Sequence, residues 1–283
     1  MIVPQSVRSV ARQIRNGLRA RDTYTPAGHF YSPTTLPSDR RRQGVWDSSS
    51  DLPGIDLNGP EQLDFARRLA AVQPAFRPRR WDAADSNTMF GDIDARVLFA
   101  VIALLHPPRI IEVGSGYSTA IMLDAGDAMS STAAITCIEP YPERLQSLLR
   151  TEDSVELLVK PVQDVPRDMF TSLSAGDLLF IDSTHVAKPG SDVLRLYLDV
   201  LPRLPAGVIV HVHDIFWPFS YRQEWLDEGR DWTEAYLLRA LLTDSPSWEI
   251  LLFNDWLWTQ HAEVGETIAP SSDRPGSIYL RRR

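Results

Sequence analysis

A short turn built on Gly114 and Gly116 is the feature that most constrains the fold of this chain. It follows the apolar run Arg109–Val113, which has the character of a buried strand, and precedes a helical pattern over Ser118–Ala128. Because glycine has no Cβ, the backbone can approach a ligand closely here, and the N-terminus of the next helix offers unpaired N–H donors. The turn therefore predicts a strand–turn–helix unit that binds a nucleotide-like cofactor.

The residues beside the turn indicate which cofactor this is. A dinucleotide-binding turn carries a third glycine, and Thr119 occupies that position. Glu112 places a carboxylate at the strand end, where it would repel a pyrophosphate but accept an ammonium or hydroxyl group. These features favour S-adenosylmethionine (SAM) over NAD. The cofactor-binding residues predicted in this segment are Glu112, Gly114, Ser115, Gly116, Tyr117 and Ser118.

Strand and helix signals alternate along the chain after residue 108. Strands are expected at 109–113, 134–139, 155–160, 177–182 and 208–214, with helices at 118–128, 142–150 and 190–201. A further helix is expected at 232–242, and two last strands at 248–253 and 277–280. Apolar strands that alternate with helices predict an α/β fold, with a mostly parallel sheet covered by helices on both faces.

The region before residue 108 divides into three parts. A basic amphipathic helix is expected at 1–22, an extended linker or covering segment at 23–60, and the α/β domain at 61–283. The domain starts with helices at 61–106: one spans Gln62–Val72, and Asp92 is expected to cap a second that ends before Pro107 and Pro108.

The N-terminal helix has an apolar stripe, and its other faces carry Arg8, Arg12, Arg15 and Arg19. We expect an arm packed on its own domain or on the partner of a homodimer. The alternatives are weak contact of residues 3–19 with an anionic membrane, because one short helix binds lipid weakly, and a transit peptide.

Charge and composition exclude several classes of protein. The net charge of −8 argues against nucleic acid as the main partner. Cys137 is the only cysteine, so one chain cannot form a disulfide, and its apolar surroundings indicate a buried strand thiol. The longest apolar run, Val97–Leu105, is about half of the roughly 18 residues that a membrane span needs. We expect a soluble, cytoplasmic protein.

A second acid follows the second expected strand. A carboxylate at Glu139, next to Pro140, can accept both hydroxyls of a ribose at once. The alternative is a favourable interaction of this acid with the N-terminus of the helix expected at 142–150.

Acids and imidazoles follow the fourth and fifth strands. Ligands of open α/β sheets bind at the carboxyl ends of the strands, so these residues are the candidates for the chemistry. Asp182, His185 and His213 are the candidate catalytic residues, with His185 as a general base because imidazole titrates near neutral pH. Asp182, Asp214 and His213 are the candidate ligands of Mg²⁺ or another divalent cation, whose role would be to lower the pKa of an acceptor oxygen. We expect His211, which lies deeper in the strand, to be a hydrogen-bonded core residue and not a ligand.

Several segments resemble one family of enzymes. The run Phe180–His185, the run Leu201–Val208 and the run Pro53–Leu57 resemble the class I SAM-dependent methyltransferases, in the group called methyltransferase family 24. This group is related to catechol-type and macrolide-sugar O-methyltransferases, and the resemblance extends from about residue 53 to the C-terminus.

The resemblance implies a Rossmann-like, seven-stranded sheet with a closing antiparallel pair, and methyl transfer to an oxygen of a small-molecule or glycan acceptor. It implies that Glu139 and Pro140 meet the ribose of SAM, that Gln163 or Asp164 meets the adenine, and that Asp182 also lies at the cofactor. One departure concerns the metal: relatives with a magnesium site carry a second carboxylate or an amide beside the fifth-strand acid, whereas His213 and Ile215 flank Asp214 here.

Two other functions remain open at this point. An NAD-linked oxidoreductase or epimerase is disfavoured by Thr119 and by the absence of a Tyr-x-x-x-Lys pair. A non-catalytic SAM-binding scaffold is the alternative from a different class. The aromatic residues after the fifth strand suggest a partly apolar acceptor pocket, although large aromatics also build ordinary cores.

Overall fold

The computed structural model describes residues 25, 29, 31–46, 52–80, 89–270 and 274–283. The basic helix expected at 1–22 lies outside these residues. The described chain divides into two compact units. One contains residues up to 46 together with Arg222–Asp231, and the other contains residues 52–221 and 232–283.

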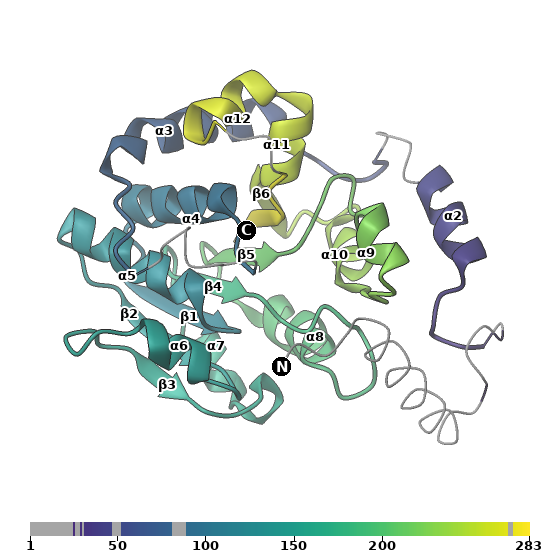
Figure 1. Cartoon of the computed structure of the whole chain (residues 1–283), viewed down its shortest axis with the longest axis horizontal. Helices are drawn as coiled ribbons and strands as arrows, with labels where there is room; N and C mark the ends of the chain where they lie inside the picture. The colour runs from purple at the N-terminus through teal and green to yellow at the C-terminus, as the bar shows by residue number, and fades with distance from the viewer. Residues whose placement is uncertain (1–24, 26–28, 30, 47–51, 81–88, 271–273) are drawn as a thin grey trace, which may run out of the picture. The chain divides into compact units, whose positions relative to one another are not determined.

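The larger unit is built on one seven-stranded sheet (Figure 1). Its strands are β1 (Arg109–Val113), β2 (Ala134–Ile138), β3 (Glu156–Leu158), β4 (Leu178–Ile181), β5 (Ile209–His213), β6 (Trp248–Phe253) and β7 (Ser277–Arg282). They lie in the order β3-β2-β1-β4-β5-β7-β6. The first five strands pair in parallel, and β7 pairs antiparallel with both β5 and β6. The expected Rossmann-like sheet with its closing antiparallel pair is confirmed.

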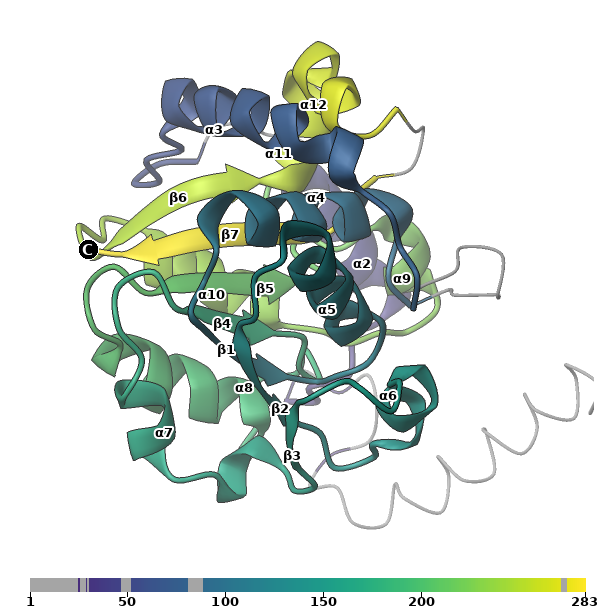
Figure 2. The same cartoon turned by 90° about the vertical axis from the view of Figure 1, so that its left-hand side faces the viewer.

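Helices cover both faces of this sheet (Figure 2). One face carries α4 (Asp92–Leu105), α5 (Tyr117–Met129) and α6 (Glu143–Leu148). The other carries α7 (Arg167–Thr171), α8 (Asp192–Arg195) and α10 (Glu234–Leu242). The chain continues from α8 through a π-helical turn at Leu196–Val200 and a 3₁₀ turn at Leu201–Arg203. These three consecutive elements lie where a single helix was expected at 190–201.

Three helices pack at the β6 end of the sheet: α3 (Gly59–Val72), α11 (Asn254–Gln260) and α12 (Ala262–Ile268). The expected helix at 62–72 is therefore present as α3. No expectation covered α7, α11 or α12, because five to seven residues are too few to display a helical period.

Helix α4 is deeply buried, and its apolar residues from Ile93 to Ala103 are all shielded from solvent. Its cap differs from the expectation. Gly91 precedes the helix in an extended conformation, and Asp92 is the first helical residue, where it pairs with Arg96 at 2.8 Å. The helix ends at His106, which adopts a left-handed conformation before the two prolines.

A buried ionic cluster fastens the segment before residue 81 to the sheet unit. The guanidinium of Arg80 is 2% exposed and donates to Asp124 on α5 at 2.6 Å, to Asp127 at 2.8 Å and to Asp153 at 2.8 Å. The Asp124 carboxylate also accepts the backbone N–H groups of Arg79 and Arg80. Each oxygen of the buried Asp124 and Asp153 carboxylates accepts at least one hydrogen bond. Buried charges need such partners, because they have lost their contact with water.

The smaller unit contains α2 (Pro37–Trp46) and α9 (Gln223–Asp227), which pack on each other. An extended segment was expected over 23–60, and this expectation is wrong at Pro37–Trp46, where the chain forms helix α2. Pro37 suits the first position of a helix, and the Asp39 carboxylate accepts the N–H of Leu36 just before it. The sequence of α2 has no apolar stripe, because arginines lie on several of its faces. The helical pattern that would have indicated this helix is therefore missing. The Thr35 hydroxyl donates a hydrogen bond to Asp231 at 2.5 Å, which connects the two chain segments of this unit.

Every helix in the described part of the chain is too short or too polar to span a lipid bilayer.

Candidate functional site

The strands that carry the predicted residues all end at one edge of the sheet. In the parallel register Val113 is level with Ile138 on one side and with Ile181 on the other, and Ile181 is level with Val212. The residues that follow each strand are therefore neighbours across the sheet. The strand order also reverses between β1 and β4, which is where open α/β sheets bind their ligands.

The glycine turn lies between β1 and α5 and contacts the end of β4. Gly114 has φ +81°, and a Cβ on it would lie 1.9 Å from the carbonyl oxygen of Asp182. No other residue fits this position. Gly116 donates its N–H to the Thr119 hydroxyl at 3.2 Å, which organises the first turn of α5. Thr119, the residue that replaces a third glycine, therefore stabilises the turn.

Glu112 lies beneath the turn rather than at its surface. Its side chain is fully buried and accepts the hydroxyls of Ser118 and Thr119, each at 2.5 Å. Burial raises the pKa of this carboxyl to about 7, although those hydrogen bonds oppose the shift. We expected Glu112 and Ser118 to meet the cofactor, and the structure instead pairs them with each other. Cys137 is buried beside them, and burial raises the pKa of its thiol, as a structural cysteine requires.

The buried carboxyl of Glu112 predicts a pH dependence of stability. It titrates near 4.5 in the unfolded chain and near 7 in the folded protein, so between these values only the folded state holds the proton. The free energy of unfolding contributed by this group is thus present below pH 4.5 and falls, by about 3 kcal/mol, as the pH rises through 7. In Glu112→Gln this loss is absent. Urea unfolding at about pH 5 and about pH 8 should therefore show the variant gaining about 3 kcal/mol relative to wild type.

Glu143→Gln, at an exposed glutamate on α6, is the control for that measurement. Parallel pH profiles of wild type and Glu112→Gln would contradict the expected role of Glu112.

Glu139 follows β2 and lies beside the turn, with an oriented carboxylate. One oxygen accepts the N–H of Ser115 at 3.1 Å, and the other accepts the N–H of Tyr141 at 2.8 Å. The Ser115 hydroxyl is buried and makes no hydrogen bond with the described chain. Each Glu139 oxygen keeps a further lone pair, so the carboxylate can still accept hydrogen bonds from a ligand.

The remaining predicted cofactor residues follow β1, β2 and β3 at the same edge of the sheet. Tyr117 is half-buried, and Pro140, Gln163 and Asp164 are exposed. Gln163 donates its amide N–H to the carbonyl of Gly190 at 3.1 Å from a short 3₁₀ turn at Val162–Asp164. Its side chain is therefore engaged with the loop before α8.

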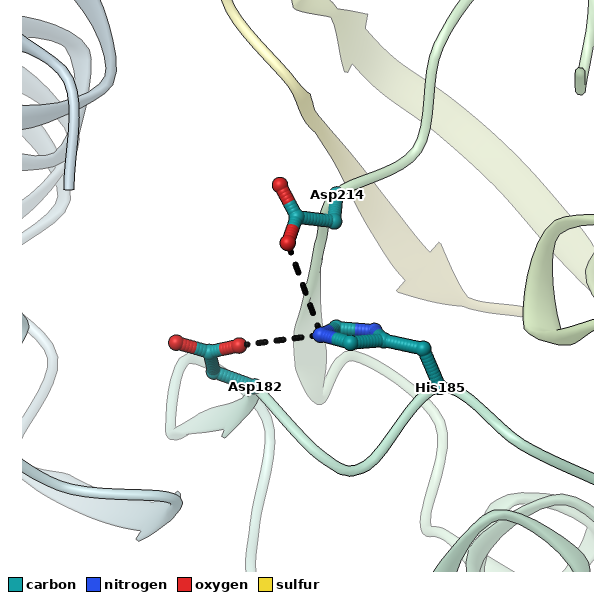
Figure 3. A group of neighbouring side chains, drawn as sticks. All are labelled: Asp182, His185 and Asp214. Carbon is teal, nitrogen blue, oxygen red and sulfur yellow. Dashed lines mark ion pairs between the residues drawn. The ribbon is translucent and has the colours of Figure 1, made fainter. Parts of the chain in front are cut away.

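Asp182, His185 and Asp214 form a compact group at the ends of β4 and β5 (Figure 3). Both carboxylates point at the same nitrogen of the His185 ring: Nε2 lies 3.4 Å from Asp182 Oδ1 and 3.5 Å from Asp214 Oδ2. One oxygen or nitrogen atom from each residue lies within 4.8 Å of the others. This spacing lets the three atoms contact a single cation.

His213 is not a member of this group, which changes the predicted ligand set. Its ring stacks on Phe90 with centroids 4.9 Å apart, and its Nε2 lies 3.8 Å from Asp214 Oδ1. Side chains alternate along β5, so His213 points with His211 towards the α4 face of the sheet. Asp214 follows with φ +56°, a left-handed conformation that turns its carboxylate towards His185 instead. His185 therefore takes the place that we expected His213 to fill.

The charges in the group stabilise a proton on His185. Burial alone would lower the pKa of this imidazole, but its bonds to Asp182 and Glu234 raise it well above the usual value. Burial raises the pKa of Asp214, whereas His213 and His185 outweigh burial at Asp182 and lower its pKa. A base that already holds its proton at neutral pH cannot remove one. With that proton in place, His185 is neither a free general base nor a metal ligand, and the proton would have to leave before Nε2 could contact a cation.

Glu234 is a further residue of this site, and the sequence did not reveal it. It is the first residue of α10, its side chain is completely buried, and its Oε2 lies 2.8 Å from Nδ1 of His185. An acid in the first turn of a helix is commonplace, and 49 residues separate this pair along the chain. No local pattern could have indicated their contact.

His211 lies in the core, as expected, but its environment differs. Its ring stacks on Phe180 with centroids 3.9 Å apart, and neither ring nitrogen has a hydrogen-bond partner among the described residues. Burial and the nearby His213 lower the pKa of His211 well below its usual value, so the ring is neutral.

Most of the aromatic residues after β5 also belong to the core. Phe216, Phe219, Tyr221, Trp248, Trp256 and Trp258 are buried. Trp232 is half-buried and packs on His185, with ring centroids 4.4 Å apart. Trp232 thus contacts the acid–imidazole group through His185.

Part of the chain matches a known protein family and a sequence relative. Residues 111–215, which contain the glycine turn and both acid-bearing strands, match a family model described as a methyltransferase domain. An uncharacterised protein of Archaeoglobus fulgidus is 32% identical over 161 residues, which cover 52% of this chain and 73% of that protein.

Solved structures that match this chain include the SAH-bound methyltransferase PaMTH1 of Podospora anserina. It is 16% identical, with a TM-score of 0.46, and the match covers 90% of this chain and 99% of that one. A Bacillus cereus O-methyltransferase in complex with SAH is 13% identical, with a TM-score of 0.43, and the match covers 86% of this chain and 100% of that one. The family model, together with the extent and identity of the Archaeoglobus match, shows that the chain belongs to the class I SAM-dependent methyltransferases, in methyltransferase family 24.

Proposed function

We propose that this protein transfers the methyl group of SAM to an oxygen of a small-molecule or glycan acceptor, at a site that also holds a divalent cation. The observation that carries the proposal is the group of Asp182, His185 and Asp214, whose donor atoms lie within 4.8 Å of one another. This group adjoins the glycine turn, because Gly114 lies against the backbone of Asp182.

The residues around the turn fit the methyl donor. Gly114 leaves room where a Cβ would collide, the Ser115 hydroxyl is a buried donor without a partner in the described chain, and Glu139 presents an oriented carboxylate. Glu139 would accept the ribose hydroxyls, and the N–H groups at the start of α5 face the turn. When bound, SAM supplies a methyl group on a sulfonium leaving group.

The acid–imidazole group fits a divalent cation. Two carboxylate oxygens and one imidazole nitrogen suit Mg²⁺ or Mn²⁺ and admit softer transition metals. A cation held there supplies positive charge that lowers the pKa of an acceptor hydroxyl. Because ligands must be deprotonated, the proton on His185 would have to leave on binding.

The protein's own contribution to the reaction is alignment. Methyl transfer requires the nucleophile, the methyl carbon and the leaving sulfur in line, so correct positioning supplies most of the acceleration. Asp182 connects the two halves of the site, because its N–H bonds Val113 of β1 while its carboxylate faces His185. Trp232 covers one face of the His185 ring and offers an aromatic surface on which a sugar or a phenol can pack.

Glu139→Ala tests the cofactor half of the proposal. Losing charge-assisted hydrogen bonds to the ribose should weaken SAM binding by roughly 10- to 100-fold in calorimetry. Glu143→Ala, at the exposed glutamate on α6, should leave the affinity unchanged. An unchanged affinity for Glu139→Ala, with the fold intact, would remove Glu139 from the cofactor site. Transfer of a labelled methyl group to a panel of phenols and glycans, with and without chelator, tests the acceptor class and the cation.

A further inference from the structure

Glu234 is a buried carboxylate that the methyl-transfer chemistry does not itself require. It is fully shielded from solvent, and its Oε2 accepts from His185 at 2.8 Å and from the Ser183 hydroxyl at 3.2 Å. Its other oxygen, Oε1, has no hydrogen-bond partner of ordinary geometry in the described chain, although the buried Tyr197 hydroxyl interacts with this carboxylate. A buried carboxylate with a half-satisfied set of partners is costly to keep. Stability alone therefore does not explain this residue.

The start of α10 holds the backbone of His185 as well as its ring. The carbonyl of His185 accepts the N–H groups of Thr233 at 2.8 Å and of Glu234 at 3.1 Å. The Thr233 hydroxyl accepts the N–H of Ala187 at 2.8 Å. These bonds surround a residue with φ +61°, a conformation that non-glycine residues adopt at a cost unless their surroundings impose it.

The hydrogen bond to Glu234 determines which nitrogen of His185 faces the carboxylates. A carboxylate accepts an N–H, so the proton of a neutral ring resides on Nδ1 and the lone pair on Nε2. Nε2 is the atom that lies between Asp182 and Asp214 (Figure 3). Carboxylate–imidazole pairs of this kind fix both the tautomer and the orientation of a ligating histidine.

We infer that Glu234 is a positioning residue that presents Nε2 of His185 to the divalent cation as its third ligand, between Asp182 and Asp214. The inference rests on the proposed function for the existence of the cation. It assigns to α10, a helix outside the matched segment 111–215, a part in building the site.

Glu234→Met and Glu234→Gln separate this role from a merely structural one. Methionine keeps most of the side-chain volume and removes the acceptor, whereas the glutamine amide oxygen can still accept from Nδ1. We expect Glu234→Met to lower the affinity for Mn²⁺, measured by electron paramagnetic resonance of the free ion, by about 10- to 100-fold. Glu234→Gln should stay within about 10-fold of wild type.

Asp192→Asn is the matched control. Asp192 is a buried carboxylate that supports the same loop through the N–H and hydroxyl of Thr184, without contacting His185. Its replacement should leave the Mn²⁺ affinity unchanged. An equal loss in Asp192→Asn and Glu234→Met would overturn the inference, because general support of the loop would then explain the effect.

The ring protons of His185 provide a readout that does not need the cation. In ¹⁵N-labelled protein, the Nδ1–H resonance should be protected from exchange in wild type and in Glu234→Gln, and lost in Glu234→Met. If wild type binds no Mn²⁺, the cation site of the proposed function is wrong. The role of Glu234 in presenting His185 as a metal ligand then fails as well. If wild type binds Mn²⁺ and Glu234→Met retains both the affinity and the protected proton, only the inference about Glu234 is overturned.

Discussion

Asp214→Asn is expected to abolish cation-dependent methyl transfer while leaving SAM binding intact. The asparagine has nearly the same shape, but it carries no charge and offers only one acceptor oxygen. Loss of a residue that merely supports a ligand costs about 10- to 100-fold in metal affinity, so loss of a direct ligand should cost at least about 100-fold. Asp182→Asn should likewise abolish cation-dependent methyl transfer, because both carboxylates face Nε2 of His185.

Turnover measured against Mn²⁺ and Mg²⁺ concentration checks this expectation, together with calorimetry for SAM. Asp192→Asn again serves as the control, since this carboxylate lies in the neighbouring loop and bonds Thr184 instead. Full activity of Asp214→Asn in the presence of chelator would exclude the cation. A loss of SAM affinity in Asp214→Asn would assign the residue to the cofactor half of the site.

The separation of the two halves follows from the order of the strands. The turn after β1 and the acid after β2 would hold the donor, and the residues after β4 and β5 would hold the cation. Gly114 joins the halves, because only a glycine there lets the backbone of Asp182 come close. Variants of Glu139 and of Asp214 should thus affect different measurements, which makes the proposal testable in separate parts.

The positions of the strand ends could be predicted from the sequence because they depend on local patterns. Apolar runs of four to six residues that alternate with helical segments place Glu139, Asp182 and Asp214 at one edge without any knowledge of packing. The antiparallel β7 needed the resemblance to a family, since nothing in its own sequence states that it inserts between β5 and β6.

The directions of the side chains could not be predicted in the same way. Whether His185 or His213 joins the two aspartates depends on left-handed conformations at His185 and Asp214, which the residue types allow but do not require. The direction of the Glu112 side chain was equally hard to predict, because an acid that ends a strand can face a ligand or lie beneath the turn. Hydrogen bonds from the hydroxyls of Ser118 and Thr119 hold it beneath the turn. Contacts across long distances in sequence, such as that of Glu234, leave no local signal.

Arg80→Met is expected to cause the largest loss of stability among the changes discussed. It removes the only cation that contacts both Asp124 and Asp153 in the described chain, and these side chains are 0% and 2% exposed. Breaking a buried ion pair from one side costs about 3 to 5 kcal/mol, because an uncompensated charge stays behind. Urea unfolding at neutral pH measures this loss. Arg79→Met, at the exposed neighbour, should change the free energy of unfolding by no more than about 0.5 kcal/mol.

The pH dependence of this loss identifies its cause. Arg80 holds the pKa of the Asp153 carboxyl below its usual value of 3.8, so the stability that the pair contributes is present above that value and is lost as the pH falls through the lowered pKa. In Arg80→Met the stranded carboxylates can take up protons instead, which relieves the buried charge. The difference in unfolding free energy between wild type and variant should therefore narrow towards acid pH. A difference that stays constant from neutral to acid pH would mean that Arg80 stabilises the protein through packing of its stem, since that contribution does not titrate.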